Sequence, residues 1–597
     1  MLYRLALLII LFSGLTSLPA AALSPTAPTI NLPHPSASAP TIQFSNYKVT
    51  NGATNSDWQA MIFALAACQS AHAAVLNIPQ GTYYFNDPGV LTRNSGGHIQ
   101  LSGMTNFTIN GNGSTFIFHY PRNGVDFYGC QRVQIKNLTV QWDFDIAAPG
   151  TVQMVNGQKA IVVNPAYPIT SSTPVQAVTE YDTTNMAWKM DAQEVYWPAS
   201  VQLIAPQTLA SPSFAMFPVG DTVAVREYVY AARAFEFSFN SNADLTFTNI
   251  TAENCPGMVF VGYGSDRGFA FQNCVIQRRN TTHDLVSTGA DGIHIGMSHG
   301  DCSIQNCNFT YLGDDSVNIH SIWMFVVSRL GSNSATISTI VYDPTYVQVG
   351  DQIEFLNASN LQPVSTAHVA AVSYNAATEI YTMAFKETLP ASLPAGVVVA
   401  NLARSSSRYN VSGNNFHDNR GRGILAQAPQ GLIQNNTIRN VMGGAINLTA
   451  DHADWNEGYG CNTVVVNKNL CDGCNYGYWG GFADEPGVCL GVINVFAQSP
   501  TGVDDFYVHQ HIQISNNTIN NTPNISFFIS SVQGLQVTGN AVTNCPASST
   551  RAFFITRSSQ VTVTGNQAVN CSIPSGAGIY VEPGSSEQVT ISNNSGF

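Results

Sequence analysis

The chain has 597 residues, only 10% of them charged, and its 23 basic and 36 acidic side chains give a formal net charge of −13. One globular core does not need this length, so the chain either divides into domains or repeats along one direction. A groove for nucleic acid, heparin or pectate needs basic residues, so the charge argues against such polyanions and favours a neutral ligand.

The first 22 residues have the three parts of a secretory signal peptide. Arg4 supplies the positive charge, Leu5 to Phe12 the apolar run, and Ala20 to Ala22 a small-residue cleavage site. The alternative is an uncleaved anchor, but the apolar run is shorter than the about 20 residues that span a bilayer. The sequence therefore predicts a secreted, extracellular protein with no stable membrane span after cleavage. Residues 23–45 are rich in Pro, Ser and Thr and are expected to form a flexible or glycosylated lead-in.

Export also affects how the twelve cysteines are interpreted. An oxidising compartment favours disulfides over metal binding. Cys471 and Cys474 have C-x-x-C spacing, with Cys461 and Cys489 nearby; zinc is the alternative, and disulfides that staple a loop are the prediction. Sequons predict a glycoprotein, although Asn residues also stack in β-helix turns; they include Asn106, Asn137, Asn249, Asn308, Asn357 and Asn516.

Residues 51–85 have the pattern of a cap followed by a first strand. Asp57 can cap a helix whose apolar side holds Trp58, Met61, Ile62 and Leu65. A short strand at 82–85 follows Gly81. This order of helix and strand resembles the opening of the pectate-lyase-like β-helix superfamily.

A unit of strand, Asn-rich turn and strand then recurs at roughly 20–25 residues, the range of solenoid repeats. Its strands alternate apolar and polar side chains, which indicates one buried and one wet face. The Asn or Gly-Asn that follows tolerates the left-handed conformation of a sharp corner. A flat sandwich is the alternative, but it does not explain the recurring Asn corner. The sequence therefore predicts an all-β fold, namely a right-handed parallel β-helix over residues 46–597. Copies of its repeating unit lie at 107–112, 133–138, 245–250, 269–274, 302–307, 409–414, 512–517, 535–540 and 561–566.

Two stretches interrupt this repeat, at about 144–231 and 322–404. Each contains a V-G-D-x-[VI] sequence, at Val219–Val223 and at Val349–Ile353. We interpret them as small β-subdomains inserted into the solenoid. Insertions into solenoids usually emerge on one face, which is often the binding face.

Three aspartates stand out because two segments of the chain are near copies. The segment Ala290–Ile295 matches Asp314–His320 when Asp291 is laid on Asp315, one coil later. Adjacent coils lie about 4.8 Å apart, so Asp291 and Asp315 should be neighbours with Asp314 beside them. Three close carboxylates cannot all ionise readily, so at least one pKa should rise.

A protonated acid beside an ionised base is what glycosidic cleavage requires, and a separation of about 6.5–9.5 Å marks an inverting enzyme. Asp291 and Asp315 share a strand parity and could hold the attacking water as general base. Asp314 has the other parity, with Asn318 and His320, and would be the general acid. The alternative is a calcium site, or aspartates that cap turns.

The same region resembles the β-helix α-1,3-galactosidases that remove terminal galactose from blood-group-B-type glycans. The stretches that carry the resemblance are Gly289–His320, Asn414–Leu425, Gly444–Leu448 and Trp455–Tyr459. The resemblance implies an inverting mechanism without metal or other cofactor, in which the three aspartates are catalytic. It also implies that Arg422, Trp455 and Glu457 line the sugar subsite. The sequence departs from the family pattern at 447–452, which bears on the choice of sugar.

The sequence thus predicts a secreted inverting glycoside hydrolase that removes terminal α-linked galactose, or a similar neutral sugar, from a carbohydrate substrate. One alternative is a polygalacturonase-like pectin hydrolase, but the Gly-His-Gly and Arg-Ile-Lys elements of such enzymes are missing. Another is a non-catalytic glycan-binding surface protein on the same scaffold. The candidate substrate-binding residues are His294, Asn318, His320, Arg422, Trp455 and Glu457. For each of them a structural role is the alternative: a hydrogen bond within a turn, a surface ion pair or packing in the core.

Overall fold

The computed structural model describes residues 23–48, 57–87, 89–90, 96–230, 236–339, 344–477, 490–500, 502–523, 525–545 and 551–597. The predicted signal peptide and Cys489 lie outside these ranges. Within them, no helix is both long and apolar enough to cross a membrane.

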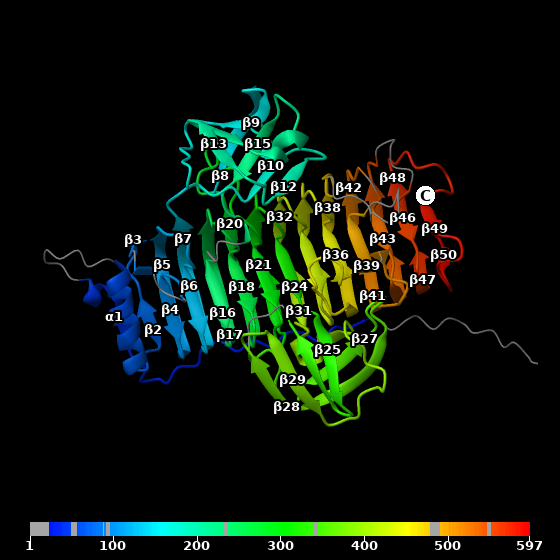
Figure 1. Cartoon of the computed structure of the whole chain (residues 1–597), viewed down its shortest axis with the longest axis horizontal. Helices are drawn as coiled ribbons and strands as arrows, with labels where there is room; N and C mark the ends of the chain where they lie inside the picture. Colours follow the sequence, from blue (N-terminus) through cyan, green and yellow to red (C-terminus); the bar gives the residue numbers. More distant parts are fainter. Residues whose placement is uncertain are drawn as a thin grey trace, which may run out of the picture.

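The predicted parallel β-helix is confirmed. Strands of successive coils pair in parallel and stack along the long axis of the molecule, in one sheet of 23 strands and one of 13 strands (Figure 1). The 13-stranded sheet carries the site described below, and its main path is β4 (Ile99–Ser102), β6 (Val125–Tyr128), β16 (Phe237–Asn240), β18 (Phe260–Tyr263), β21 (Ile293–Gly296), β24 (Val317–His320), β33 (Ile424–Gln427), β36 (Ile446–Asp451), β39 (Ile493–Ser499), β43 (Phe527–Ile529), β46 (Phe553–Ile555) and β49 (Ile579–Val581).

Helix α1 (Asp57–Ser70) caps the N-terminal end of the solenoid, as the sequence predicts. Met61 and Leu65 are buried against the first coil, together with Ala60 and Ala64. The predicted apolar side is wrong at Ile62, which is 42% exposed. The buried side of the helix instead includes Ala60 and Ala64.

A ladder of buried asparagines fixes the corner that follows each coil. From Asn436 onward, the Oδ1 atom of each member accepts from the backbone N–H and the Nδ2 of the member one coil earlier, at 2.9–3.0 Å. The members are Asn414, Asn436, Asn469, Asn517, Asn540, Asn566 and Asn594. In the coils from Asn414 onward, the recurring Asn of the sequence is therefore a buried hydrogen-bonding element that joins neighbouring coils, whereas Asn137, Asn249 and Asn273 of earlier coils have the predicted left-handed conformation.

We expect Asn469→Ala to lower the free energy of unfolding by about 3 kcal/mol. The change leaves the buried carbonyl of Ile433 and the amide of Asn436 without the hydrogen bonds that Asn469 now makes, and each unpaired buried group costs about 1–3 kcal/mol. Chemical unfolding of the whole chain measures the effect. Gln567→Ala, at an exposed position, is the control; equal stability losses in the two variants would contradict a special role for the ladder.

Two lobes project from the solenoid on either side of the central coils (Figure 1). The first is an eight-stranded, largely antiparallel sheet within 144–231, built from β8 (Ala147–Val155), β9 (Gln158–Val163), β10 (Ala177–Asp182), β11 (Ala187–Trp188), β12 (Glu194–Tyr196), β13 (Gln202–Ala205), β14 (Thr208–Ala210) and β15 (Thr222–Arg226). The second is a closed antiparallel barrel within 322–404, built from β25 (Met324–Gly331), β26 (Ser334–Ser338), β29 (Ile380–Phe385), β28 (Pro363–Asn375), β27 (Gln352–Leu356) and β30 (Val398–Asn401).

The lead-in differs from the flexible segment that its composition predicts. It lies along the corners of several coils before β1 (Thr41–Gln43) joins the solenoid. The backbone N–H of Thr29 donates to Asp301 (3.1 Å), Nδ2 of Asn31 donates to Asp244 (3.0 Å), and the N–H of His34 donates to Asn106 (3.1 Å). Prolines suit this placement because an extended chain can present its remaining N–H groups to side chains of the coils.

The predicted disulfides around the C-x-x-C sequence are wrong. Cys461, Cys471 and Cys474 are buried free thiols, and Cys471 shares its register with Ile438 and Ile519 of the neighbouring coils. It therefore fills an aliphatic position of the core, where a free cysteine behaves as a small apolar residue. Among the described residues one disulfide is formed, between Cys545 and Cys571.

Candidate active site

Three buried carboxylates converge on the outer side of the 13-stranded sheet. Asp291 precedes β21, and Asp314 and Asp315 precede β24 in the next coil. One oxygen from each lies within 4.8 Å of the others. The Asp315 N–H donates to Oδ1 of Asp291 (3.3 Å), while the Gly292 N–H donates to the Asp315 carbonyl (2.9 Å). The predicted one-coil offset therefore places Asp291 and Asp315 side by side.

Nitrogen donors engage both oxygens of Asp291 and both oxygens of Asp315. The second oxygen of Asp291 lies 2.6 Å from Nδ1 of His294. Asp315 accepts from the backbone N–H of Arg422 (2.5 Å) and from its Nη1 (3.1 Å). An oxygen that already accepts an N–H bond is a poor place for a proton, and all four oxygens of these two groups accept such a bond.

Asp314 has a different environment. Its Oδ1 accepts from Nη1 of Arg420 (3.1 Å), and its Oδ2 has no hydrogen bond from any described residue. Arg420 is itself held by Glu194 of β12, through Nε (2.7 Å) and Nη2. The first lobe thus contributes the outer member of a buried chain that runs from Glu194 through Arg420 to Asp314.

The pair of adjacent aspartates shares its protons. Burial raises the pKa of Asp314, and raises that of Asp315 to about 7, although Arg420 and Arg422 beside them favour the ionised forms. Two interacting carboxyls titrate as one unit, so the raised pKa values favour a proton shared by this pair. Because both oxygens of Asp315 accept N–H bonds, this proton fits best on Oδ2 of Asp314.

A close approach of the backbone brings the arginines to the aspartates. Gly421 lies between Arg420 and Arg422, and a Cβ there would come within 2.4 Å of the Asp314 carbonyl carbon and 2.5 Å of the Asp315 nitrogen. Both contacts are with backbone, which cannot turn aside as a side chain can. The glycine therefore allows the next coil to seat its two guanidinium groups on the carboxylates.

Histidines and a glutamate form a second layer behind Asp291. Nε2 of His294 lies 2.5 Å from the Tyr263 hydroxyl and 2.8 Å from Nε2 of His320. Nδ1 of His320 donates to the Ser321 carbonyl (2.7 Å). Burial disfavours charge on His294, but its hydrogen bond with Asp291 and the charge of that carboxylate outweigh burial and raise its pKa. Burial lowers the pKa of His320. The raised pKa favours the charged form of His294 beside Asp291.

Glu457 lies beyond this layer. It accepts from Nδ2 of Asn318 (3.2 Å) and from Nε2 of Gln427 (2.9 Å), and lies 3.8 Å from His320. Burial opposes its charge, yet His320 and His294 hold its pKa below the usual value. The amide oxygens of Asn318 and Gln427 are buried and have no hydrogen-bond partner among the described residues. They are acceptors suited to hydroxyl donors.

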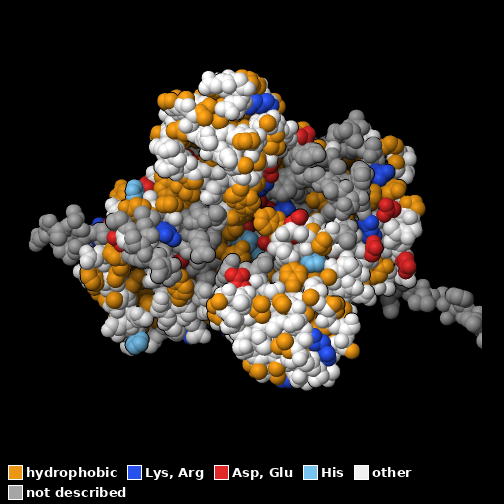
Figure 2. Space-filling model, viewed as in Figure 1, with side chains coloured by type: hydrophobic (Ala, Val, Ile, Leu, Met, Phe, Trp, Pro, Cys, Tyr) orange, Lys and Arg blue, Asp and Glu red, His pale blue; other side chains and the backbone are white. Residues whose placement is uncertain are grey.

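Aromatic residues line the rim of the site, and most come from the first lobe. Tyr196 ends β12, Trp197 follows it, and Tyr230 lies at the return from the lobe to the solenoid. Trp455, 54% exposed, lies in the loop after β36 with its ring 6.0 Å from that of Tyr230. Figure 2 shows the surface hollowed between the two lobes, with acidic, basic and histidine side chains at the bottom of the hollow.

The structure thus brings the three predicted aspartates together with His294, Asn318, His320 and Glu457. Arg422 contacts Asp315, where sequence reasoning placed it on the sugar, and Trp455 lies at the rim. Sequence reasoning missed several neighbours of these groups, namely Glu194, Tyr196, Arg226, Tyr230, Tyr263, Arg420 and Gln427. The signal that could have identified two of them is the pairing of acid and aromatic residues in Glu194–Trp197.

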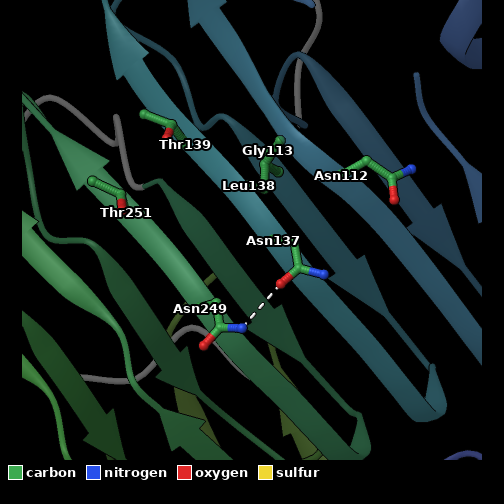
Figure 3. A pocket seen from close by; sticks show the side chains of 7 residues that line it. All are labelled: Asn112, Gly113, Asn137, Leu138, Thr139, Asn249 and Thr251. Atoms are coloured by element: carbon green, nitrogen blue, oxygen red, sulfur yellow. Dashed lines mark hydrogen bonds between the residues drawn. The ribbon is translucent and has the colours of Figure 1, made fainter. Parts of the chain in front are cut away.

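A second depression lies away from the carboxylates, on β5 (Thr105–Phe118), β7 (Gln131–Trp142) and β17 (Ala243–Glu253) (Figure 3). Its lining residues are Asn112, Gly113, Asn137, Leu138, Thr139, Asn249 and Thr251. None of these side chains titrates near neutral pH, so the depression has no acid–base chemistry. Nδ2 of Asn249 donates to Oδ1 of Asn137 (2.9 Å), so two predicted glycosylation sequons are engaged with each other.

Comparison with known proteins supports both the fold and the predicted resemblance. Residues 482–596 match a family model described as a right handed beta helix region. Alpha-1,3-galactosidase B of Bacteroides thetaiotaomicron is 23% identical over 528 residues, 80% of this chain and 82% of that protein. Alpha-1,3-galactosidase B of Akkermansia muciniphila is 25% identical over 474 residues, 72% of this chain and 57% of that protein. The resemblance to α-1,3-galactosidases is therefore confirmed.

Among solved structures, the catalytic domain of a GH87 alpha-1,3-glucanase in complex with tetrasaccharides is similar over 95% of this chain and 70% of that one. Its sequence identity is 13% and its TM-score is 0.48.

Proposed function

We propose that this protein, a relative of α-1,3-galactosidases, is a glycoside hydrolase that removes a terminal α-linked galactose, or a similar neutral sugar, with inversion at the anomeric carbon. The observation that carries the proposal is the buried group of three carboxyls, in which the hydrogen bonds favour one protonated and two ionised members. This is the combination that cleavage of a glycosidic bond requires. The names of the relatives support an α-1,3 linkage.

In the proposed mechanism Asp314 is the general acid. Its Oδ2 donates a proton to the glycosidic oxygen as the bond to the anomeric carbon breaks. Asp291 and Asp315 accept a hydrogen bond from one water and take its proton as the water attacks the opposite face of the sugar. His294 and Arg422 hold these two carboxylates ionised and in position. After one turnover the proton taken from water passes back to Asp314, within the carboxyl group or by exchange with solvent, and the starting protonation state is restored.

The support for inversion comes from the hydrogen bonds, not from the spacing. Oxygens within 4.8 Å are closer than the about 6.5–9.5 Å usual between acid and base of inverting enzymes. Retention, however, needs a carboxylate free to attack carbon. Each oxygen of Asp291 and Asp315 already accepts an N–H bond, which weakens both as nucleophiles while leaving lone pairs for a water.

The direct test offers the whole protein α-galactosyl-1,3-galactose and an aryl α-galactoside, and follows the first-formed anomer by proton NMR. We expect free galactose, released first as the β-anomer. Galactose released first as the α-anomer would rule out inversion. No hydrolysis of either compound, while other neutral α-glycosides are cleaved, would move the proposal to another sugar. No hydrolysis of any α-glycoside would overturn it.

The shared proton predicts a pH dependence. The acid must be protonated, so kcat/KM should fall as the pH rises through the pKa of Asp314, which burial raises above its usual range. The positive charge of Arg422 lowers this pKa, so Arg422→Met should move the alkaline limb to higher pH. Rate profiles of the parent and the variant measure the shift. An unchanged limb in the variant would show that this pair does not control it.

A further inference from the structure

Four aromatic residues form a continuous surface at the rim of the cleft, which we call the aromatic shelf: Tyr196, Trp197, Tyr230 and Trp455. Ring centroids lie 5.5 Å apart between Tyr196 and Trp197, 6.4 Å between Trp197 and Tyr230, and 6.0 Å between Tyr230 and Trp455. Trp197 is 53% exposed and Trp455 is 54% exposed. Large apolar side chains grouped at a surface usually mark a binding site.

The backbone holds Trp197 in an unfavourable conformation. Its φ of +47° lies in the left-handed region, which bulky side chains rarely adopt. Such conformations persist where the surrounding structure imposes them, and they concentrate at ligand-binding sites. The exposed indole is therefore held out from the lobe at an energetic cost, although burial of the ring elsewhere would be more favourable.

The inner end of the shelf borders the carboxylates. The guanidinium carbon of Arg420 lies 4.8 Å from the centre of the Tyr196 ring, and Nη1 of the same arginine donates to Asp314. Arg226 lies 4.9 Å from the same ring and donates to the carbonyl of Gly313, the residue before Asp314. Tyr196 is thus fixed next to the group that acts as acid in the proposed mechanism.

We propose that the aromatic shelf is the subsite for the leaving group, and that it binds the sugar unit from which the terminal residue is cleaved by stacking against that unit's pyranose ring. This inference rests on the proposed function. A general acid lies beside the oxygen that departs, so the departing sugar must extend over the residues next to Asp314. These are Tyr196 and, further out, Trp197.

The chemistry of the shelf suits a sugar better than a wholly apolar partner. A pyranose has an apolar face of C–H groups and a rim of hydroxyls, and aromatic side chains combine an apolar face with polar edges. The cleft beyond the carboxylates offers buried amide acceptors, Asn318 Oδ1 and Gln427 Oε1, which need hydroxyl donors. A ligand that meets both surfaces is an oligosaccharide, with its terminal unit in the cleft and the next unit on the shelf.

The test compares two substrates that share the terminal sugar. α-Galactosyl-1,3-galactose has a leaving sugar to stack on the shelf, whereas α-galactosyl fluoride has none. We expect Trp197→Ala to lower kcat/KM for the disaccharide about tenfold, as the loss of one good ring contact implies, and to change kcat/KM for the fluoride less than twofold. Tyr84→Ala is the matched control, because Tyr84 is 52% exposed on the first coils, near the cap. It should change neither value.

The outcomes separate this inference from the proposed function. If the parent cleaves both substrates and Trp197→Ala lowers both rates equally, or neither, the shelf is not the leaving-group subsite. If the parent cleaves neither, the galactose specificity of the proposed function fails, and calorimetric titration with the disaccharide then tests the shelf alone. Binding to the parent that weakens at least fivefold in Trp197→Ala supports it, and equal or absent binding overturns it. Thermal unfolding of each variant shows that the fold is intact.

Discussion

Asp314→Asn should lower kcat/KM for α-galactosyl-1,3-galactose by about 100- to 10,000-fold, the usual contribution of a general acid. Asparagine preserves the shape of the side chain but cannot donate a proton to the departing oxygen and remain neutral. Fluoride leaves with little help from a proton, so the same variant should keep most of its activity on α-galactosyl fluoride. Steady-state kinetics with the two substrates measures the difference.

The other two aspartates provide the control. Asp291→Asn and Asp315→Asn remove the groups that accept the proton of water, and water attacks whatever the leaving group is. Both variants should therefore lose activity on the disaccharide and on the fluoride alike. If Asp315→Asn instead spares the fluoride and Asp314→Asn does not, the acid and base roles are exchanged between the adjacent residues.

Arg420→Met should lower the free energy of unfolding by about 3–5 kcal/mol, since it leaves buried carboxylates without their counter-charge. Arg420 is 3% exposed and contacts both Asp314 and Glu194. Burial opposes its charge, but Tyr196, Glu194 and Asp314 raise the pKa of the guanidinium far above its usual range. Denaturant unfolding, followed by circular dichroism, measures the loss. Activity should fall with it, because Asp314 loses the donor that orients it.

Arg439→Met is the matched control for this experiment. Arg439 is exposed, and its Nη2 donates to Asn415 at 3.3 Å. An exposed polar contact contributes little, so this variant should unfold within about 0.5 kcal/mol of the parent. If both variants lose a similar amount of unfolding free energy, the buried ion pairs of Arg420 do not stabilise the fold more than an exposed contact does.

Much of the architecture could be predicted because it is repeated. Alternating strands and Asn corners recur along the chain, so each copy supports the interpretation of the others. The 24-residue offset between the two halves of the aspartate motif was enough to place Asp291 beside Asp315, since successive coils of a parallel helix stack in register. In such a solenoid, sequence distance converts directly into position along the axis.

The surroundings of the aspartates could not be predicted in this way. Glu194 and Arg420 are 226 residues apart in the sequence, and no local pattern around either residue indicates that they form an ion pair. The position of an inserted lobe over the solenoid depends on packing between the two, not on periodicity. The disulfide prediction was wrong for a related reason. The C-x-x-C spacing also fits one inward position of a strand and a second position in the corner that follows it.

The contacts of the lead-in imply an order in which parts of the chain can fold. Thr29 is bonded to Asp301, Asn31 to Asp244 and His34 to Asn106, so the segment runs against the direction in which the coils are synthesised. Its bond to Asp301 joins groups 272 residues apart and cannot form until that coil exists. The residue nearest the predicted cleavage site is thus the last of the three to be fastened. The lead-in of the folded protein therefore closes over coils that have already formed.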